Sequence, residues 1–184
     1  MRRRYGFSAL LLVAGTFLPQ APVLAQCLPP RLLAQCFTTN TLRADSISKL
    51  LPAAEWEPHE GPAPYWTGKA GALGAPAAWV GLRLTNQQAA YDLVYKTTQS
   101  ACITQLRTEL RQRASLRSEP ITCVQCWGER LVGYDYTVTI FNQKASYAAK
   151  RAEFPYVVVI RRTSRAGTDD TSEAEVLTPQ PAGH

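Results

Sequence analysis

The sequence has few of the residues on which common enzyme mechanisms depend. Histidine occurs twice, as His59 and as His184 near the carboxyl end, so a mechanism that needs a histidine rests on His59. No glycine-rich phosphate loop and no serine-nucleophile elbow is present. Glu60 follows His59, and Asp135 is expected on the outward side of a strand, but no spacing brings two acids together. The sequence therefore favours a protein that is not an enzyme, with no cofactor and no metal site.

Long apolar runs are missing as well. No segment approaches 18 consecutive apolar residues, so we expect no transmembrane helix. Residues 1–25 instead have the parts of an export signal: arginines at positions 2–4, an apolar stretch over 9–18 and the small-residue site Val23-Leu24-Ala25. We expect cleavage before Gln26 and a mature protein in the periplasm or outside the cell.

A lipid anchor at Cys27 is the alternative to soluble export. Leu24-Ala25-Gln26-Cys27 resembles a lipobox, and lipidation of Cys27 would leave an even number of cysteines. Two features oppose it. Gln26 stands where a lipobox has a small residue, and the segment 19–22 separates the apolar stretch from Cys27. We therefore expect a soluble exported protein.

Charge is distributed unevenly along the chain. Half of the formal net charge of +6 comes from three arginines within 1–25. Residues 26–163 are mildly basic and are expected to form a single domain. Residues 164–184 have little apolar content and are expected to be a disordered tail. That tail has one arginine, Arg165, against four acids: Asp169, Asp170, Glu173 and Glu175.

A long central helix is the main prediction of secondary structure. Thr85 and Gln88 have the spacing of a capping box, so the helix is expected to begin at Thr85. An apolar stripe follows at intervals of three and four residues: Tyr91, Tyr95, Thr98, Cys102, Leu106 and Leu110. Four arginines near its end are expected on the solvated face: Arg107, Arg111, Arg113 and Arg117. No aromatic residues alternate with them, so we expect no nucleic-acid partner.

The other predicted elements are shorter. A helix is expected from Thr39 or Asn40 to Leu51, and a Pro/Gly-rich arm without regular structure over 52–78. Strands are expected over 77–84, over the alternating run 132–141 and over 156–160. Together these elements predict an α+β fold, in which an antiparallel sheet of three to four strands packs on one long helix.

The cysteines are the most specific chemical signal. The chain has five: Cys27, Cys36, Cys102, Cys123 and Cys126. In an exported protein we expect disulfides. A bond from Cys102 to Cys123 or Cys126 would staple the helix to the next strand. Cys36 could then bond to the remaining cysteine of the CxxC, or Cys27 could pair with Cys36, and one thiol is left over.

Two functional interpretations compete with structural disulfides. Cys123 and Cys126 could form a thiol-disulfide oxidoreductase site, but a reactive cysteine of this kind normally begins a helix. A strand is expected to follow here. A single CxxC is also only half of a zinc site.

The arm holds the candidate binding residues Trp56, Tyr65 and Trp66. Exposed aromatic residues are enriched at recognition sites, whereas folding back over the sheet would make these three an outlying part of the core. The sequence thus predicts an exported, disulfide-stabilised binding, inhibitor or envelope interaction module. Its partner would be an unknown protein, peptide or carbohydrate.

Overall fold

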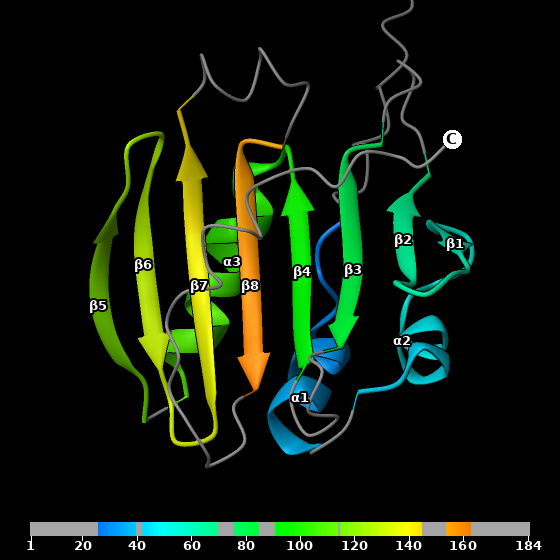
Figure 1. The fold of residues 1–184 in the computed structure, drawn as a ribbon, viewed down its shortest axis with the longest axis horizontal. Coiled ribbons are helices and arrows are strands. Elements are labelled where there is room, and N and C mark those ends of the chain that lie inside the picture. The colour runs from blue at the N-terminus through cyan, green and yellow to red at the C-terminus, as the bar shows by residue number, and fades with distance from the viewer. Residues whose placement is uncertain are drawn as a thin grey trace, which may run out of the picture.

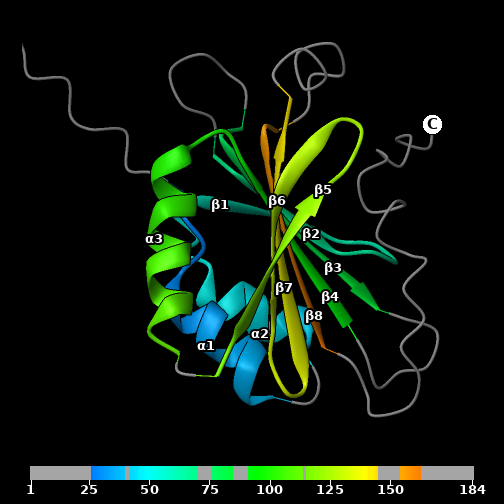
Figure 2. The same ribbon diagram turned by 90° about the vertical axis from the view of Figure 1, so that its left-hand side faces the viewer.

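The computed structural model describes residues 26–39, 42–69, 76–84, 91–113, 115–144 and 154–162. Within these ranges the chain forms an antiparallel sheet of eight strands with three helices on one of its faces (Figures 1 and 2). The signal expected over 1–25 and the tail expected over 164–184 lie outside them.

The helices are α1 (Pro30–Thr38), α2 (Ala44–Leu50) and α3 (Ser100–Arg111). The strands are β1 (Trp56–His59), β2 (Tyr65–Gly68), β3 (Ala78–Leu84), β4 (Tyr91–Thr97), β5 (Arg117–Thr122), β6 (Cys126–Val132), β7 (Tyr136–Gln143) and β8 (Tyr156–Arg162).

The sheet consists of two four-stranded meanders joined at their last strands. Its order is β1-β2-β3-β4-β8-β7-β6-β5, so β8 pairs with both β4 and β7. Helix α3 connects the two meanders. The β-branched run of β8 suits this central position, since its side chains are buried on both faces of the sheet.

The main core lies between the sheet and the helices. Alternate strand residues point toward the helices, among them Val80, Leu93, Val138, Val158 and Ile160. The helices contribute one face each: Leu32, Leu33 and Cys36 from α1, Ile47 from α2, and Cys102, Ile103, Leu106 and Leu110 from α3.

The long helix predicted from Thr85 is wrong. Residues 91–97 form strand β4, and α3 begins only at Ser100. The error has a physical cause, because residues four apart share a face in a strand as well as in a helix. Tyr91 and Tyr95 satisfy both patterns, and Leu93 between them is also buried on the helix side. The cap proposed at Thr85 lies outside the described residues.

The prediction of three to four strands is also wrong. The arm expected over 52–78 contains β1 and β2, where Pro58 is tolerated because β1 is the edge strand. The single strand expected over 132–141 is a hairpin. Val132 ends β6, and β7 begins at Tyr136 after a turn.

Other elements agree with the sequence. The strand expected over 77–84 is confirmed as β3, and that over 156–160 is confirmed within β8, which continues through Arg161 and Arg162. The short amino-terminal helix is present as α2, but it begins at Ala44. Helix α1 was not predicted; Pro30 occupies its first turn, where the missing amide hydrogen costs no helix hydrogen bond.

Candidate functional site

A row of stacked side chains crosses four strands on the face of the sheet opposite the helices, here called the helix-free face. The ring of His59 stacks on Tyr65 at a centroid distance of 4.4 Å. Tyr65 stacks on Trp79 at 5.9 Å, and Lys96 Nζ lies 5.2 Å from the centroid of a Trp79 ring. These four residues, which come from β1, β2, β3 and β4 in turn, are the aromatic row. Each is half-buried and so keeps some surface open to solvent.

Strand register brings the row together. His59 is opposite Tyr65, Tyr65 is opposite Gly81, and Trp79 is opposite Lys96. A Cβ on Gly81 would overlap Trp79 Cη2, so glycine leaves room for the indole ring. His59 Nε2 also lies 2.8 Å from Thr67 Oγ1, which fixes the orientation of the imidazole.

An apolar strip continues the row across the middle of the same face. It consists of five buried residues from β4, β6, β7 and β8: Val94, Cys126, Phe141, Val157 and Val159. Three half-buried residues pack against the strip: Trp79, Ile121 and Cys123. The aromatic row and the CxxC therefore adjoin one continuous apolar surface.

Charged groups on this face are predominantly basic. Asp92 on β4 is buried and accepts two bonds from Arg161 on β8, Nε to Oδ1 at 2.9 Å and Nη2 to Oδ2 at 3.2 Å. By strand alternation, the same face also has the basic residues Arg83, Lys96, Arg117 and Arg130 and the acids Glu57 and Glu119. A surface of this kind favours a partner with negative charge.

Cys123 and Cys126 flank the turn between β5 and β6. Their sulfurs lie at disulfide distance, with the Cα atoms 5.0 Å apart. Lys144 holds the turn, because its amide donates to the Gln125 carbonyl and its Nζ to the Val124 carbonyl at 2.7 Å. Neither cysteine begins a helix, so no helix dipole favours a thiolate here.

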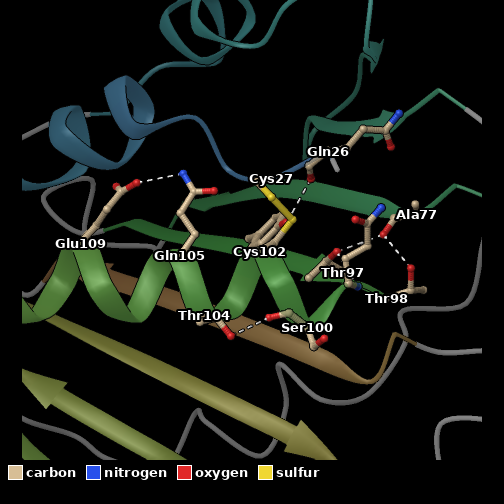
Figure 3. The surroundings of a disulfide bond; sticks show 12 residues. Gln26, Cys27, Ala77, Thr97, Thr98, Ser100, Cys102, Thr104, Gln105 and Glu109 are labelled. Carbon is tan, nitrogen blue, oxygen red and sulfur yellow. Dashed lines mark hydrogen bonds between the residues drawn. A yellow bond between two sulfur atoms is a disulfide. The ribbon is translucent and has the colours of Figure 1, made fainter. Parts of the chain in front are cut away.

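Cys27 pairs with Cys102, not with any of the partners expected from the sequence. This disulfide joins the segment before α1 to the first turn of α3 (Figure 3), with a Cα–Cα distance of 5.0 Å. The predicted bond from Cys102 to Cys123 or Cys126 is wrong, because Cys102 is in the core on the helix side of the sheet, whereas the other two adjoin the apolar strip on the opposite face.

Cys36 is the free cysteine among the described residues. Its side chain is buried, and burial raises the pKa of its thiol to about 12. A thiol in this state is protonated at neutral pH and is a poor nucleophile. We therefore assign Cys36 to the core.

The candidate binding residues divide between the two faces. Trp56 and Trp66 are in the core with exposed fractions of 2% and 3%, and the Trp66 indole donates to Ser48 Oγ at 3.1 Å. Of the two interpretations of the arm, these two residues therefore fit the one in which its aromatic side chains fold back and join the core. Tyr65 lies on the helix-free face. Trp79 and Lys96 were not predicted from the sequence, although Trp79, Gly81 and Arg83 alternate with apolar residues along β3.

Nowhere in the described ranges do three or more His, Cys, Asp or Glu residues gather to hold a metal ion. None of the helices in those ranges is long and apolar enough to cross a membrane. No protein-family model matches the chain, and neither a curated protein nor a solved structure matches it.

Proposed function

We propose that the protein is an exported, non-catalytic binding module that holds an acidic peptide segment of another protein against its helix-free face. The aromatic row carries the proposal: three rings and an ammonium group from four strands are presented side by side, with part of their surface open. Rings that are stacked before binding lose little conformational freedom when a partner arrives.

The surrounding charges favour the acidic partner. Lys96 ends the row, and Arg83 lies on the same face of the neighbouring strand β3. Export is supported by the signal-like residues 1–25 and by the Cys27–Cys102 disulfide, which requires an oxidising compartment. A peptide chain also suits a sheet face, because its side chains can contact several strands in succession.

The test is an array of immobilised peptides, graded in acidity and aromatic content, probed with the mature protein and two matched variants. Trp79→Ala removes the centre of the row. Trp127→Ala removes another tryptophan of the same sheet, one that is 51% exposed on β6 and outside the row. We expect acidic peptides to bind the parent and Trp127→Ala equally, and Trp79→Ala at least tenfold more weakly. Equal binding by all three proteins, or retention only on neutral glycan beads, would contradict the proposal.

A thiol-disulfide oxidoreductase is the second candidate function. Cys123 is half-buried beside Val124, which is 82% exposed at the tip of the turn, so a substrate disulfide could approach it. Attack by Cys123 on that disulfide would give a mixed disulfide, which Cys126 would resolve by forming the Cys123–Cys126 bond and releasing the reduced substrate. An insulin-reduction assay with dithiothreitol as the reductant decides this. Activity that disappears in Cys123→Ser would support the candidate, and activity no faster than with dithiothreitol alone would exclude it.

A further inference from the structure

The two outermost strands of the sheet each contain a proline. Strands β1 and β5 end the strand order on opposite sides of the molecule (Figure 1), and they contain Pro58 and Pro120. An outer strand normally presents a row of unpaired amides and carbonyls, to which another chain can add as a further strand. Proline has no amide hydrogen. Its effect on strand addition therefore depends on whether its nitrogen faces the neighbouring strand or faces outward.

On β5, the proline nitrogen faces outward. The amide of Cys123 donates to the Cys126 carbonyl at 3.0 Å, in line with the register of β5 and β6. Hydrogen-bonded pairs alternate with non-bonded pairs along an antiparallel ladder. Three residues of β5 therefore direct their backbone nitrogens away from β6, and all three are exposed: Ser118, Pro120 and Thr122. Pro120 thus removes the middle one of three outward donors.

On β1, the outward side offers no donor at all. The amide of Lys69 donates to the Glu55 carbonyl at 2.7 Å, in line with the register of β1 and β2. By the same alternation, the nitrogens of Trp56 and Pro58 face outward. The Trp56 amide already donates to the Pro52 carbonyl at 2.9 Å, and Pro58 has no amide hydrogen to donate.

Strand β5 keeps two outward donors, so its closure depends on one residue. Two copies of β5, paired antiparallel about a two-fold axis at position 120, would place Ser118 opposite Thr122 of the second copy. Glu119 would be opposite Ile121, and no like charges would be directly opposite each other. At the axis the two Pro120 rings would meet, where residues with amide hydrogens would exchange two hydrogen bonds. The remaining donors lie about 14 Å apart along the strand.

We propose that Pro120 prevents the sheet from growing by strand addition at β5, and that Pro58 does so at β1. A partner is then recognised by side chains on a face of the sheet, because neither outer strand has a complete row of donors. The inference goes beyond the proposed function. It concerns the edges of the sheet and holds whether or not the helix-free face binds an acidic peptide.

Analytical ultracentrifugation of the mature protein and three variants tests the role of Pro120. Pro120→Thr restores the amide with a residue that favours strands. We expect this variant to dimerise at about 100 µM, where the parent is a monomer, because two regained hydrogen bonds strengthen self-association at least tenfold. Adding Ser118→Pro to Pro120→Thr moves the missing donor along the same outer side and should restore the monomer. Glu119→Thr should remain a monomer, because the Glu119 amide faces β6.

Amide hydrogen exchange locates the contact between the copies. In the Pro120→Thr dimer, the amides at positions 118, 120 and 122 should be protected and should lose this protection on dilution. Circular dichroism checks the fold, and Pro120→Ala replaces Pro120→Thr in every comparison if the latter does not fold.

Four results would overturn the inference. They are a monomeric Pro120→Thr, a dimer that protects amides elsewhere, equal dimerisation of the variant that also has Ser118→Pro, and a parent that already dimerises through β5. The two proposals fail separately, since Trp79→Ala tests peptide binding and Pro120→Thr tests strand addition.

Discussion

Asp92 and Arg161 form a two-bond ion pair across the junction of the two meanders, with 3% and 17% of their side chains exposed. Removing one partner of a buried pair leaves the other charge uncompensated, which typically costs about 3–5 kcal/mol. We expect Asp92→Ala to lower the free energy of unfolding by about 3 kcal/mol, measured by urea denaturation.

The matched control for the ion pair is Arg117–Glu119 on β5, whose side chains are 77% and 39% exposed. Glu119→Ala should change stability by no more than about 1 kcal/mol, as is usual for surface pairs. Equal losses for Asp92→Ala and Glu119→Ala would show that burial of the Asp92–Arg161 pair is unimportant.

The Cys27–Cys102 disulfide is predicted to contribute more to the free energy of unfolding than the Cys123–Cys126 disulfide. It joins residues separated by 75 positions, whereas Cys123 and Cys126 are separated by 3. In the chain-entropy model the first should contribute about 4 kcal/mol and the second about 2 kcal/mol or less. Denaturation of the double serine variants at each pair measures both, and an equal loss for the two would refute the ranking.

Stability is predicted to fall at alkaline pH. Burial raises the pKa of Tyr91 and of Tyr95 to about 12 from an ordinary value of 10.0. As pH rises through 10, the unfolded chain releases these protons while the folded chain still holds them. The stabilisation is therefore complete below pH 10 and is lost between about pH 10 and 12.

Urea midpoints at pH 8, 10 and 11, together with tyrosinate absorbance, check the alkaline prediction. Tyr91→Phe should reduce the slope of stability against pH, whereas Tyr134→Phe, at a side chain that is 79% exposed, should leave it unchanged. An unaltered slope in Tyr91→Phe would count against a role for its burial.

Gly81 is predicted to be required for the aromatic row. A Cβ at this position would overlap the Trp79 ring, so Gly81→Ala should displace the indole and cost about 1–3 kcal/mol, as overpacking usually does. Gly61→Ala is the control, because no atom lies within 4 Å of its added Cβ. Near-ultraviolet circular dichroism measures the displacement of the indole, and urea denaturation measures the loss of stability. Identical spectra for Gly81→Ala and the parent would contradict this prediction.

The predictability of this fold from sequence differs between elements. The run 156–160 reads correctly as a buried strand because its valines and isoleucine leave no helical period. By contrast, Tyr91 and Tyr95 fit helix and strand equally, and the alternation through 132–141 conceals the turn at Gly133. Pro58 and Pro64 make β1 and β2 resemble a loop, since their strand pairing depends on the neighbouring β3.

The candidate site was harder to predict than the strands. Tyr65 was identified as an aromatic residue between prolines, but its stacking partners His59 and Trp79 come from other strands. Register between strands is a tertiary property, so no local spacing shows that these residues meet. The Cys27–Cys102 bond was missed for the same reason, because it depends on the segment before α1 lying against α3, 75 positions away in the sequence.

The central position of β8 affects how the protein can be made. Until Tyr156–Arg162 has emerged, β4 and β7 are both unpaired edges, although every other strand is already present. Such edges readily join other chains, and pairings between distant parts of a chain form slowly. The two meanders thus stay separate until β8 is available, so the sheet forms as one unit only after β8 has been synthesised.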